Sequence, residues 1–120
     1  DRTVRLKVCC GINSGLMIAG ETGPKGRGEY TFTGNAVKRA RLLEALNKRF
    51  GTDILISEYT LALAGKYFIT EELPPVKIRG SKKELRVFAV INVKVTKSGI
   101  KQPKPTNLDE LRQMLSTTPE

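Results

Sequence analysis

Apolar and polar residues alternate along several short stretches of the chain, which is the pattern of half-buried β-strands. In residues 4–12, VRLKVCCGI, three apolar side chains alternate with two basic ones. Further strands are predicted within 15–23, at 30–33 and 53–57, and at 67–79 and 83–92, with Gly-Ser-Lys joining the last two as a hairpin.

Two stretches between these strands have helical spacing. In the longer one, Asn35 is a candidate N-cap and Gly51 a candidate C-cap. Its apolar positions recur every three or four residues, at Val37, Ala40, Leu43, Leu46 and Phe50. A shorter helix, EYTLALAG, is predicted to end at Gly65. The order strand, strand, helix, strand, helix, strand, strand predicts an α+β or α/β sandwich with helices on one face.

The character of the sequence changes after residue 92. Residues 1–92 form the predicted domain, and the polar, Pro-bearing residues 93–106 are predicted to be a linker. Residues 107–120 begin with a third helix, NLDELRQMLS, which has a capping residue, early acids and leucines at helical spacing. A lone helix of this length is marginal in water, so we expect it to dock on another part of the protein.

Composition narrows the class of protein. No apolar run approaches the roughly 18 residues of a membrane helix, and the start has no signal-peptide pattern. We therefore expect an intracellular, cytoplasmic chain or the cytosolic domain of a larger, membrane-anchored protein, with no membrane contact by this segment. The absence of His excludes Ser-His and Cys-His catalysis and any zinc site that needs His. The net charge of +9 favours anionic partners: nucleotides, nucleic acids or an acidic protein surface.

Three stretches together carry a family resemblance. GINSGLMIAGETG, GEYTFTGNAVKRARLLEALNKRFGTDILIS and VKIRGSKKELRVFAV, in this order, resemble the class III adenylyl and guanylyl cyclase catalytic domain from about residue 4 to residue 92. The resemblance implies an α+β, ferredoxin-like cyclase-type sandwich in partial form, with a mixed or antiparallel sheet and helices on one face. It covers the C-terminal half only, because the family's metal-binding aspartates and base-reading lysine belong to the first half.

The same resemblance implies cofactors and partners. Mg or Mn is expected for the complete family domain, and none is expected to be bound by this chain alone. The implied partners are a nucleoside triphosphate (ATP by preference), the missing N-terminal half and a second copy in a homodimer. Unpaired strand edges also favour such pairing.

The resemblance places the family's catalytic Asn and Arg, four residues apart on one helix, at Lys38 and Leu42. Leucine cannot donate a hydrogen bond, so this is a departure from the family pattern. Lys38 as a point cation and Arg41 as a guanidinium are the candidate catalytic substitutes, because residues three apart lie near one helix face. The alternative, which we favour, is that KRAR is a solvated basic face.

Three further residues are candidates for nucleotide binding. Thr31 matches the family's base-reading position, although Thr is also common in strands. Arg79 matches the triphosphate-contacting lysine and can grip phosphate bidentately, although a hairpin Arg is usually solvated. Asn35 opens the basic helix beside them. The glycine-rich loop at 20–28 lacks the Lys-Ser/Thr pair of a P-loop, and the scattered acids suggest no metal site.

Three functions follow from these observations. The first is the C-terminal part of a class III nucleotidyl cyclase in intracellular cyclic-nucleotide signalling, adenylyl by the Thr31 match, which converts ATP to cAMP and pyrophosphate. It is degenerate at Lys38 and Leu42 and not expected to be active as this fragment. The second is a non-catalytic cyclase-homology module for dimerisation or nucleotide sensing. The third is a basic nucleic-acid binder, ranked last because aromatics make up only 6% and no stacking strand appears.

Overall fold

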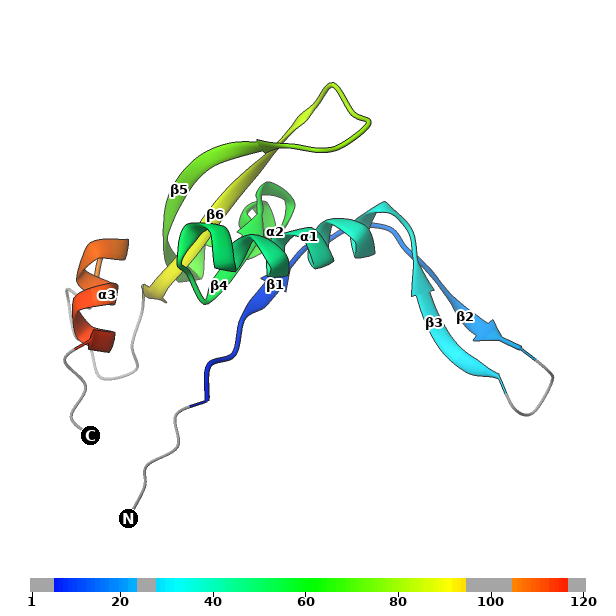
Figure 1. Ribbon diagram of the computed structural model, residues 1–120, viewed down its shortest axis with the longest axis horizontal. Helices are drawn as coiled ribbons and strands as arrows, with labels where there is room; N and C mark the ends of the chain where they lie inside the picture. The colour runs from blue at the N-terminus through cyan, green and yellow to red at the C-terminus, as the bar shows by residue number, and fades with distance from the viewer. Residues whose placement is uncertain (1–5, 24–27, 95–104, 117–120) are drawn as a thin grey trace, which may run out of the picture.

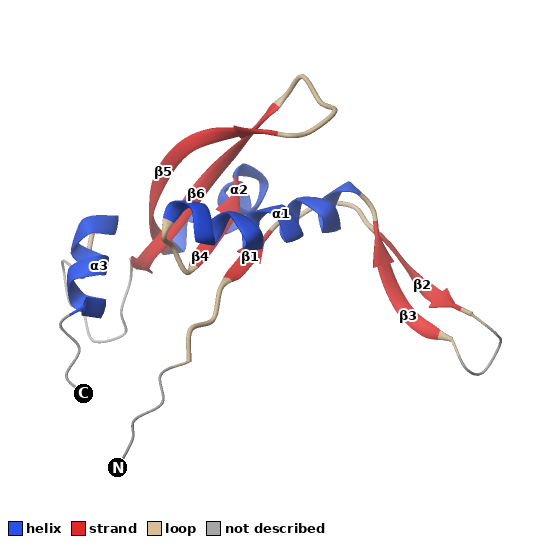
Figure 2. Cartoon of the chain, viewed as in Figure 1, coloured by secondary structure: helices blue, strands red, loops and turns tan. Residues whose placement is uncertain are grey.

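The computed structural model describes residues 6–23, 28–94 and 105–116 (Figure 1). The main sheet has four strands in the order β1 (Cys10–Ile12), β4 (Ile54–Ser57), β6 (Glu84–Val93) and β5 (Phe68–Lys77). β1 is parallel to β4, and the other pairs are antiparallel. β2 (Ile18–Thr22) and β3 (Glu29–Thr33) form a separate antiparallel hairpin that projects away from the main sheet (Figure 2).

The helices are α1 (Asn35–Phe50), α2 (Glu58–Ala64), the short 3-10 helix η1 (Gly65–Tyr67) and α3 (Leu108–Ser116). The mixed sheet with helices confirms the predicted α+β class. None of these helices combines the length and the apolar character needed to span a bilayer, within the residues that the structure describes.

The core lies on one face of the main sheet, and the two-residue period of β6 explains its position. Alternate residues of β6 turn toward this face and are buried with leucines of the helices α1 and α3. The buried core cluster comprises Leu43, Leu46, Leu55, Leu73, Val76, Leu85, Val87, Ala89, Ile91 and Leu108. Ile56 and Phe88, which pair across β4 and β6, are buried on the opposite face.

Strand β1 packs directly against the backbone of α1. A Cβ atom at Gly11 would overlap the backbone of Ala40, Leu43 and Glu44, so only glycine permits this close approach. The helix ends as predicted at Gly51, which has a φ of 65° and donates its backbone N–H to the carbonyl oxygen of Asn47. One glycine, Gly11, therefore allows β1 to approach α1, and a second, Gly51, ends the helix.

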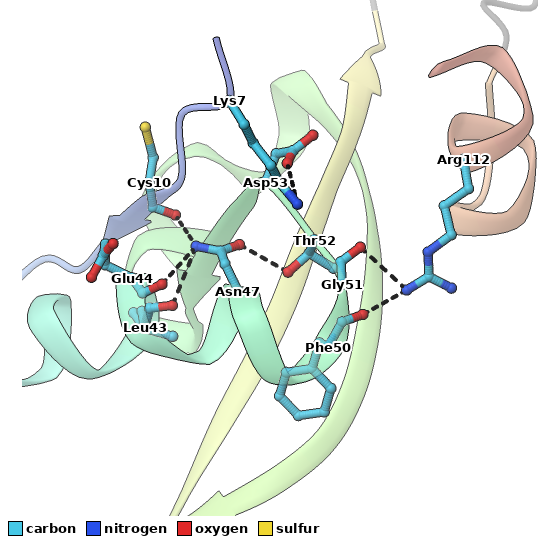
Figure 3. A network of polar contacts seen from close by, with 10 residues as sticks. All are labelled: Lys7, Cys10, Leu43, Glu44, Asn47, Phe50, Gly51, Thr52, Asp53 and Arg112. Atoms are coloured by element: carbon cyan, nitrogen blue, oxygen red, sulfur yellow. Dashed lines mark hydrogen bonds and ion pairs between the residues drawn. The ribbon is translucent and has the colours of Figure 1, made fainter. Parts of the chain in front are cut away.

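Asn47 is the polar link between α1 and β1 (Figure 3). Its side chain is buried, and its Nδ2 donates to the carbonyl oxygen of Cys10 at 3.0 Å and to that of Glu44 at 3.2 Å. Its Oδ1 accepts the hydroxyl hydrogen bond of Thr52 at 2.8 Å. Each polar atom of this buried amide thus has a partner, as burial requires.

Helix α3 docks on the sheet, as its marginal length predicted. Leu108 is buried in the core cluster, and its backbone N–H donates to Glu71 Oε1 at 3.2 Å. Asn107 Oδ1 caps the helix by accepting from the N–H of Glu110 at 2.8 Å. Arg112 Nη2 donates to the carbonyl oxygen of Phe50 at 2.6 Å, at the end of α1 (Figure 3). The docking thus joins α3 to both β5 and α1.

Two local predictions are wrong. Asn35 is the first residue of α1 rather than its N-cap; Gly34, with a φ of 130°, takes the cap position, and no side chain caps the helix. Within the described part of the strand predicted at 4–12, only β1 pairs with a neighbour, and Leu6 and Val8 are 87% and 69% exposed. Alternation buries a strand only where a neighbouring strand and a packed face exist.

Parts of four predictions lie outside the described residues. They are the start of the first strand, the tip of the 20–28 loop at 24–27, and residues 95–104 of the 93–106 linker. The last four residues of the predicted 107–120 segment lie outside them as well.

Candidate functional site

A pocket of about 310 Å³ lies between the first half of α1 and the turn that joins β5 to β6. We call it the cationic pocket. It is lined by Asn35, Lys38, Arg39, Leu42, Ile78, Arg79 and Ser81. The structure thus brings three of the sequence-predicted site residues, Asn35, Lys38 and Arg79, to one place.

Helical spacing explains which side chains of α1 reach the cationic pocket. Asn35, Lys38, Arg39 and Leu42 are spaced i, i+3, i+4 and i+7 and therefore form one stripe. Arg41 belongs to a different stripe, which lines a separate hollow against Cys9 and strand β1. The structure therefore does not bring Arg41 to Lys38, and the proposed substitution of the missing guanidinium by Arg41 has no support from this geometry.

Arg39 is a pocket residue that the sequence reasoning missed. Its side chain is half-buried, and its guanidinium carbon lies 5.4 Å from the ring centroid of Tyr59 on α2. A cation over an aromatic face at this distance is attracted by the ring's electron density. The signal was available in the sequence, because Arg39 stands four residues after Asn35.

The charge of the cationic pocket is uncompensated. Among the described residues that line it, none is Asp or Glu. The ion pairs of the described residues lie elsewhere, at Lys7–Asp53 and around Arg86, and none includes Lys38, Arg39 or Arg79. Three cations around one hollow without a counter-charge favour an anionic ligand.

Hydrogen bonds fix the start of α1 beside this pocket. Asn13 Nδ2 donates to the carbonyl oxygen of Ala36 at 3.0 Å, and Asn13 Oδ1 accepts from the hydroxyl of Ser57. On the other side of the pocket, Gly80 has a φ of 80° in the turn after Arg79. The backbone N–H of Ser81 donates to the carbonyl oxygen of Ile78 at 3.0 Å. Hydrogen bonds therefore hold both walls of the pocket.

Thr31 lies apart from the cationic pocket. It is on β3 in the projecting hairpin, and its hydroxyl donates to the carbonyl oxygen of Gly20 at 3.3 Å. It is not among the residues that line the pocket. The hydroxyl oxygen retains lone pairs for a further hydrogen bond.

The residues at hand do not fit the divalent ion that the family resemblance implies. Mg and Mn prefer carboxylate and carbonyl oxygens. The described part of the chain has no group of three or more His, Cys, Asp or Glu residues placed to hold a metal. The side chains around the cationic pocket carry positive charge, which repels such an ion.

Comparisons with known proteins show what this chain is similar to. No family model matches the chain. A curated relative, adenylate cyclase 1 of Rhizobium meliloti (strain 1021), is 32% identical over 83 residues. The match covers 69% of this chain and 12% of the relative, so the chain spans about an eighth of that protein.

Solved structures agree with this match. The adenylyl cyclase CyaB of P. aeruginosa has a TM-score of 0.58 at 26% identity, covering 68% of this chain and 41% of that one. The guanylate cyclase domain of RhGC from Catenaria anguillulae, in complex with GTP, has a TM-score of 0.58 at 26% identity, covering 70% and 44%.

The fold is therefore that of the class III adenylyl and guanylyl cyclase catalytic domains, which confirms the resemblance over part of the chain. Adenylyl and guanylyl cyclases are homologues of this protein. The matching segment is thus similar to part of the catalytic domains of these cyclases.

Proposed function

We propose that the chain is the C-terminal part of a class III nucleotidyl cyclase domain and that its cationic pocket binds the phosphate tail of a nucleoside triphosphate. The observation that carries this proposal is the convergence of Asn35, Lys38 and Arg79 on one pocket. These residues come from α1 and from the β5–β6 turn, the two regions that the family resemblance assigns to nucleotide contacts.

The chemistry of the family explains what each residue contributes. In the family reaction the 3′-hydroxyl of the ribose attacks the α-phosphate and pyrophosphate leaves, so negative charge must be stabilised on phosphate oxygens. Arg79 binds two phosphate oxygens through its planar guanidinium, and Lys38 acts as a point cation. Leu42 supplies no donor where the family has its arginine. Nucleotide binding is thus retained in this proposal, and stabilisation of the transition state is lost.

ATP is the proposed nucleotide because Thr31 matches the base-reading position of some adenylyl cyclases. The GTP complex of the Catenaria relative supports a nucleoside triphosphate as the ligand class. Since Thr31 lies on the hairpin outside the pocket, we expect the pocket itself to contribute little to base choice.

A non-catalytic role in dimerisation is the second candidate, and the β2–β3 hairpin favours it. Tyr30 and Phe32 are exposed on one face of this projecting hairpin, and the two rings lie edge to face with centroids 5.8 Å apart. Exposed apolar side chains grouped in this way mark interaction surfaces. The proposed partner is a second copy of the chain, and sedimentation analysis of a Tyr30→Ser, Phe32→Ser variant tests this role.

A turnover and binding experiment tests the proposed function. The 120-residue chain is incubated with ATP or GTP and manganese, and cyclic nucleotide is measured. We expect no product, together with saturable ATP binding that Arg79→Ala weakens. Cyclic nucleotide from the isolated chain, or ATP binding that Arg79→Ala leaves unchanged, contradicts the proposal. A salt-sensitive gel shift with RNA or DNA instead of nucleotide binding favours the nucleic-acid alternative.

A further inference from the structure

Leu42 stands where the family has its catalytic arginine and has no guanidinium. The same stripe of helix α1 nevertheless carries an arginine at another position. Arg39 stands three residues before Leu42, and both line the cationic pocket. The Tyr59 ring, 5.4 Å from the Arg39 guanidinium carbon, restrains this side chain from α2. A restrained guanidinium loses less entropy on binding an anion than a free one.

The charge and size of the pocket define the ligand. Lys38, Arg39 and Arg79 form no ion pair with any described residue, and no described carboxylate lines the pocket. The cations that line the pocket can neutralise a phosphate chain that carries no metal, and the pocket offers no described carboxylate to a phosphate-bound metal. The volume of about 310 Å³ is at the lower end for small-molecule pockets, which suits a phosphate tail better than a whole nucleotide.

We infer that the cationic pocket binds a linear polyphosphate group in its metal-free form and that Arg39 is a specificity-determining residue of this site. The inference rests on the proposed function and deepens it, because it names the ionic form of the ligand. Two sources share this chemistry: the tail of a nucleoside triphosphate and free inorganic polyphosphate. Magnesium competes with the protein cations for the phosphate oxygens, so it weakens binding.

Titration calorimetry of the full 120-residue chain tests the inference. The probes are sodium tripolyphosphate, pyrophosphate and orthophosphate, each in EDTA and in excess magnesium. We expect tripolyphosphate to bind at least about tenfold more tightly than orthophosphate, since each additional charge-assisted contact contributes. Excess magnesium is expected to weaken tripolyphosphate binding. Tighter binding with magnesium, or no binding in EDTA, overturns the inference.

Two arginines of the same helix provide a matched pair of variants. Arg39→Ala is expected to weaken tripolyphosphate binding about tenfold, whereas Arg41→Ala, which removes the same charge outside the pocket, changes it less than about threefold. Arg39→Lys keeps the positive charge but loses the planar guanidinium that can bind two phosphate oxygens at once, so we expect intermediate affinity. Equal losses from Arg39→Ala and Arg41→Ala overturn the inference, because they indicate general attraction. Circular dichroism confirms folding of each variant.

ATP and GTP titrations separate this inference from the proposed function. If ATP and GTP both bind in EDTA and Arg39→Ala weakens their binding, the inference and the proposed function both stand. If tripolyphosphate binds in EDTA and neither nucleotide does, the proposed function fails while the site for free polyphosphate stands. If the nucleotides bind only with magnesium, the inference fails and the proposed function stands.

Discussion

The Nδ2 of Asn47 donates a hydrogen bond to the carbonyl oxygen of Cys10 at 3.0 Å, and this bond ties the helix of the cationic pocket to the edge strand of the sheet (Figure 3). The same amide accepts from Thr52 beyond the end of the helix. The buried side chain of Asn47 therefore joins helix α1, strand β1 and the segment that follows the helix. The orientation of α1, and with it the pocket, depends on this residue.

Asn47→Ala is expected to lower the free energy of unfolding by about 2 kcal/mol, because it leaves buried partners of Asn47 without a hydrogen bond. Urea denaturation measures this change. Lys48→Ala, at the exposed next position, is the control and is expected to change stability by less than about 0.5 kcal/mol. Similar values for the two variants would mean that the Asn47 network contributes little.

Gly11→Ala is expected to destabilise the protein by about 2 kcal/mol, since the added Cβ forces α1 away from β1. The displaced helix should also bind ATP more weakly. The matched control is Gly20→Ala, because Gly20 has open space around its Cβ position and is not among the positive-φ glycines. Thermal melting of both variants is the measurement, and an unchanged melting temperature for Gly11→Ala contradicts the close approach.

The pair of Glu72 and Arg86 predicts a pH dependence. Arg86 donates from Nε to Glu72 Oε2 at 3.1 Å and from Nη2 to Oε1 at 2.9 Å. The side-chain hydrogen bond from Arg86 lowers the pKa of Glu72 below its ordinary value. A lowered folded-state pKa gives stability that is present above the unfolded pKa, about 4.3, and is lost as pH falls through the folded value.

Glu72→Gln therefore should reduce the loss of stability below about pH 4, since the variant has no carboxylate to protonate. Above that pH it should be slightly less stable than the parent chain. Urea midpoints measured between acidic and neutral pH test this. Parallel pH profiles for the two proteins would show that the pair does not contribute.

A chimera tests the assignment of Lys38 and Leu42. When the metal-binding half of an active adenylyl cyclase is placed before residue 4, we expect little cAMP formation, because Leu42 has no donor. Lys38→Asn with Leu42→Arg should raise turnover by about 100-fold, the scale of one lost transition-state donor. In that background Arg41→Ala should leave turnover unchanged. Equal turnover with and without the two substitutions contradicts the assignment.

The periodicity of apolar residues correctly predicted several helices and strands that pack on the core. The β5–β6 hairpin, β4 and the span of α1 to Gly51 are confirmed, and each of them contributes side chains to the core cluster. The alternation at Leu6 and Val8 led to a wrong strand prediction. Both side chains are exposed, and a sequence pattern does not indicate whether a neighbouring strand is present. The Asn35 cap was wrong because Gly34, at positive φ, already turns the chain into the helix.

The candidate site could be predicted in part. Family spacing led to Asn35, Lys38 and Arg79, which the structure gathers in one pocket. It did not lead to Arg39, because the resemblance was used to assign catalytic roles only to Lys38 and Leu42 on this helix, and the contact of Arg39 with Tyr59 comes from another helix. Arg41 was grouped with Lys38 on spacing alone. The packing of α1 against β1 decides between the two stripes, and the sequence does not contain that information directly.

A two-dimensional NMR titration of the isotope-labelled 120-residue chain with ATP tests the central claim most directly. The account predicts saturable shifts of the backbone amides at 35–42 and 78–81 and of the side-chain Nε–H signals of Arg39 and Arg79, while the Arg41 signal stays in place. Absence of shifts, or shifts that centre on Arg41 and the β1 side of the helix, would contradict it.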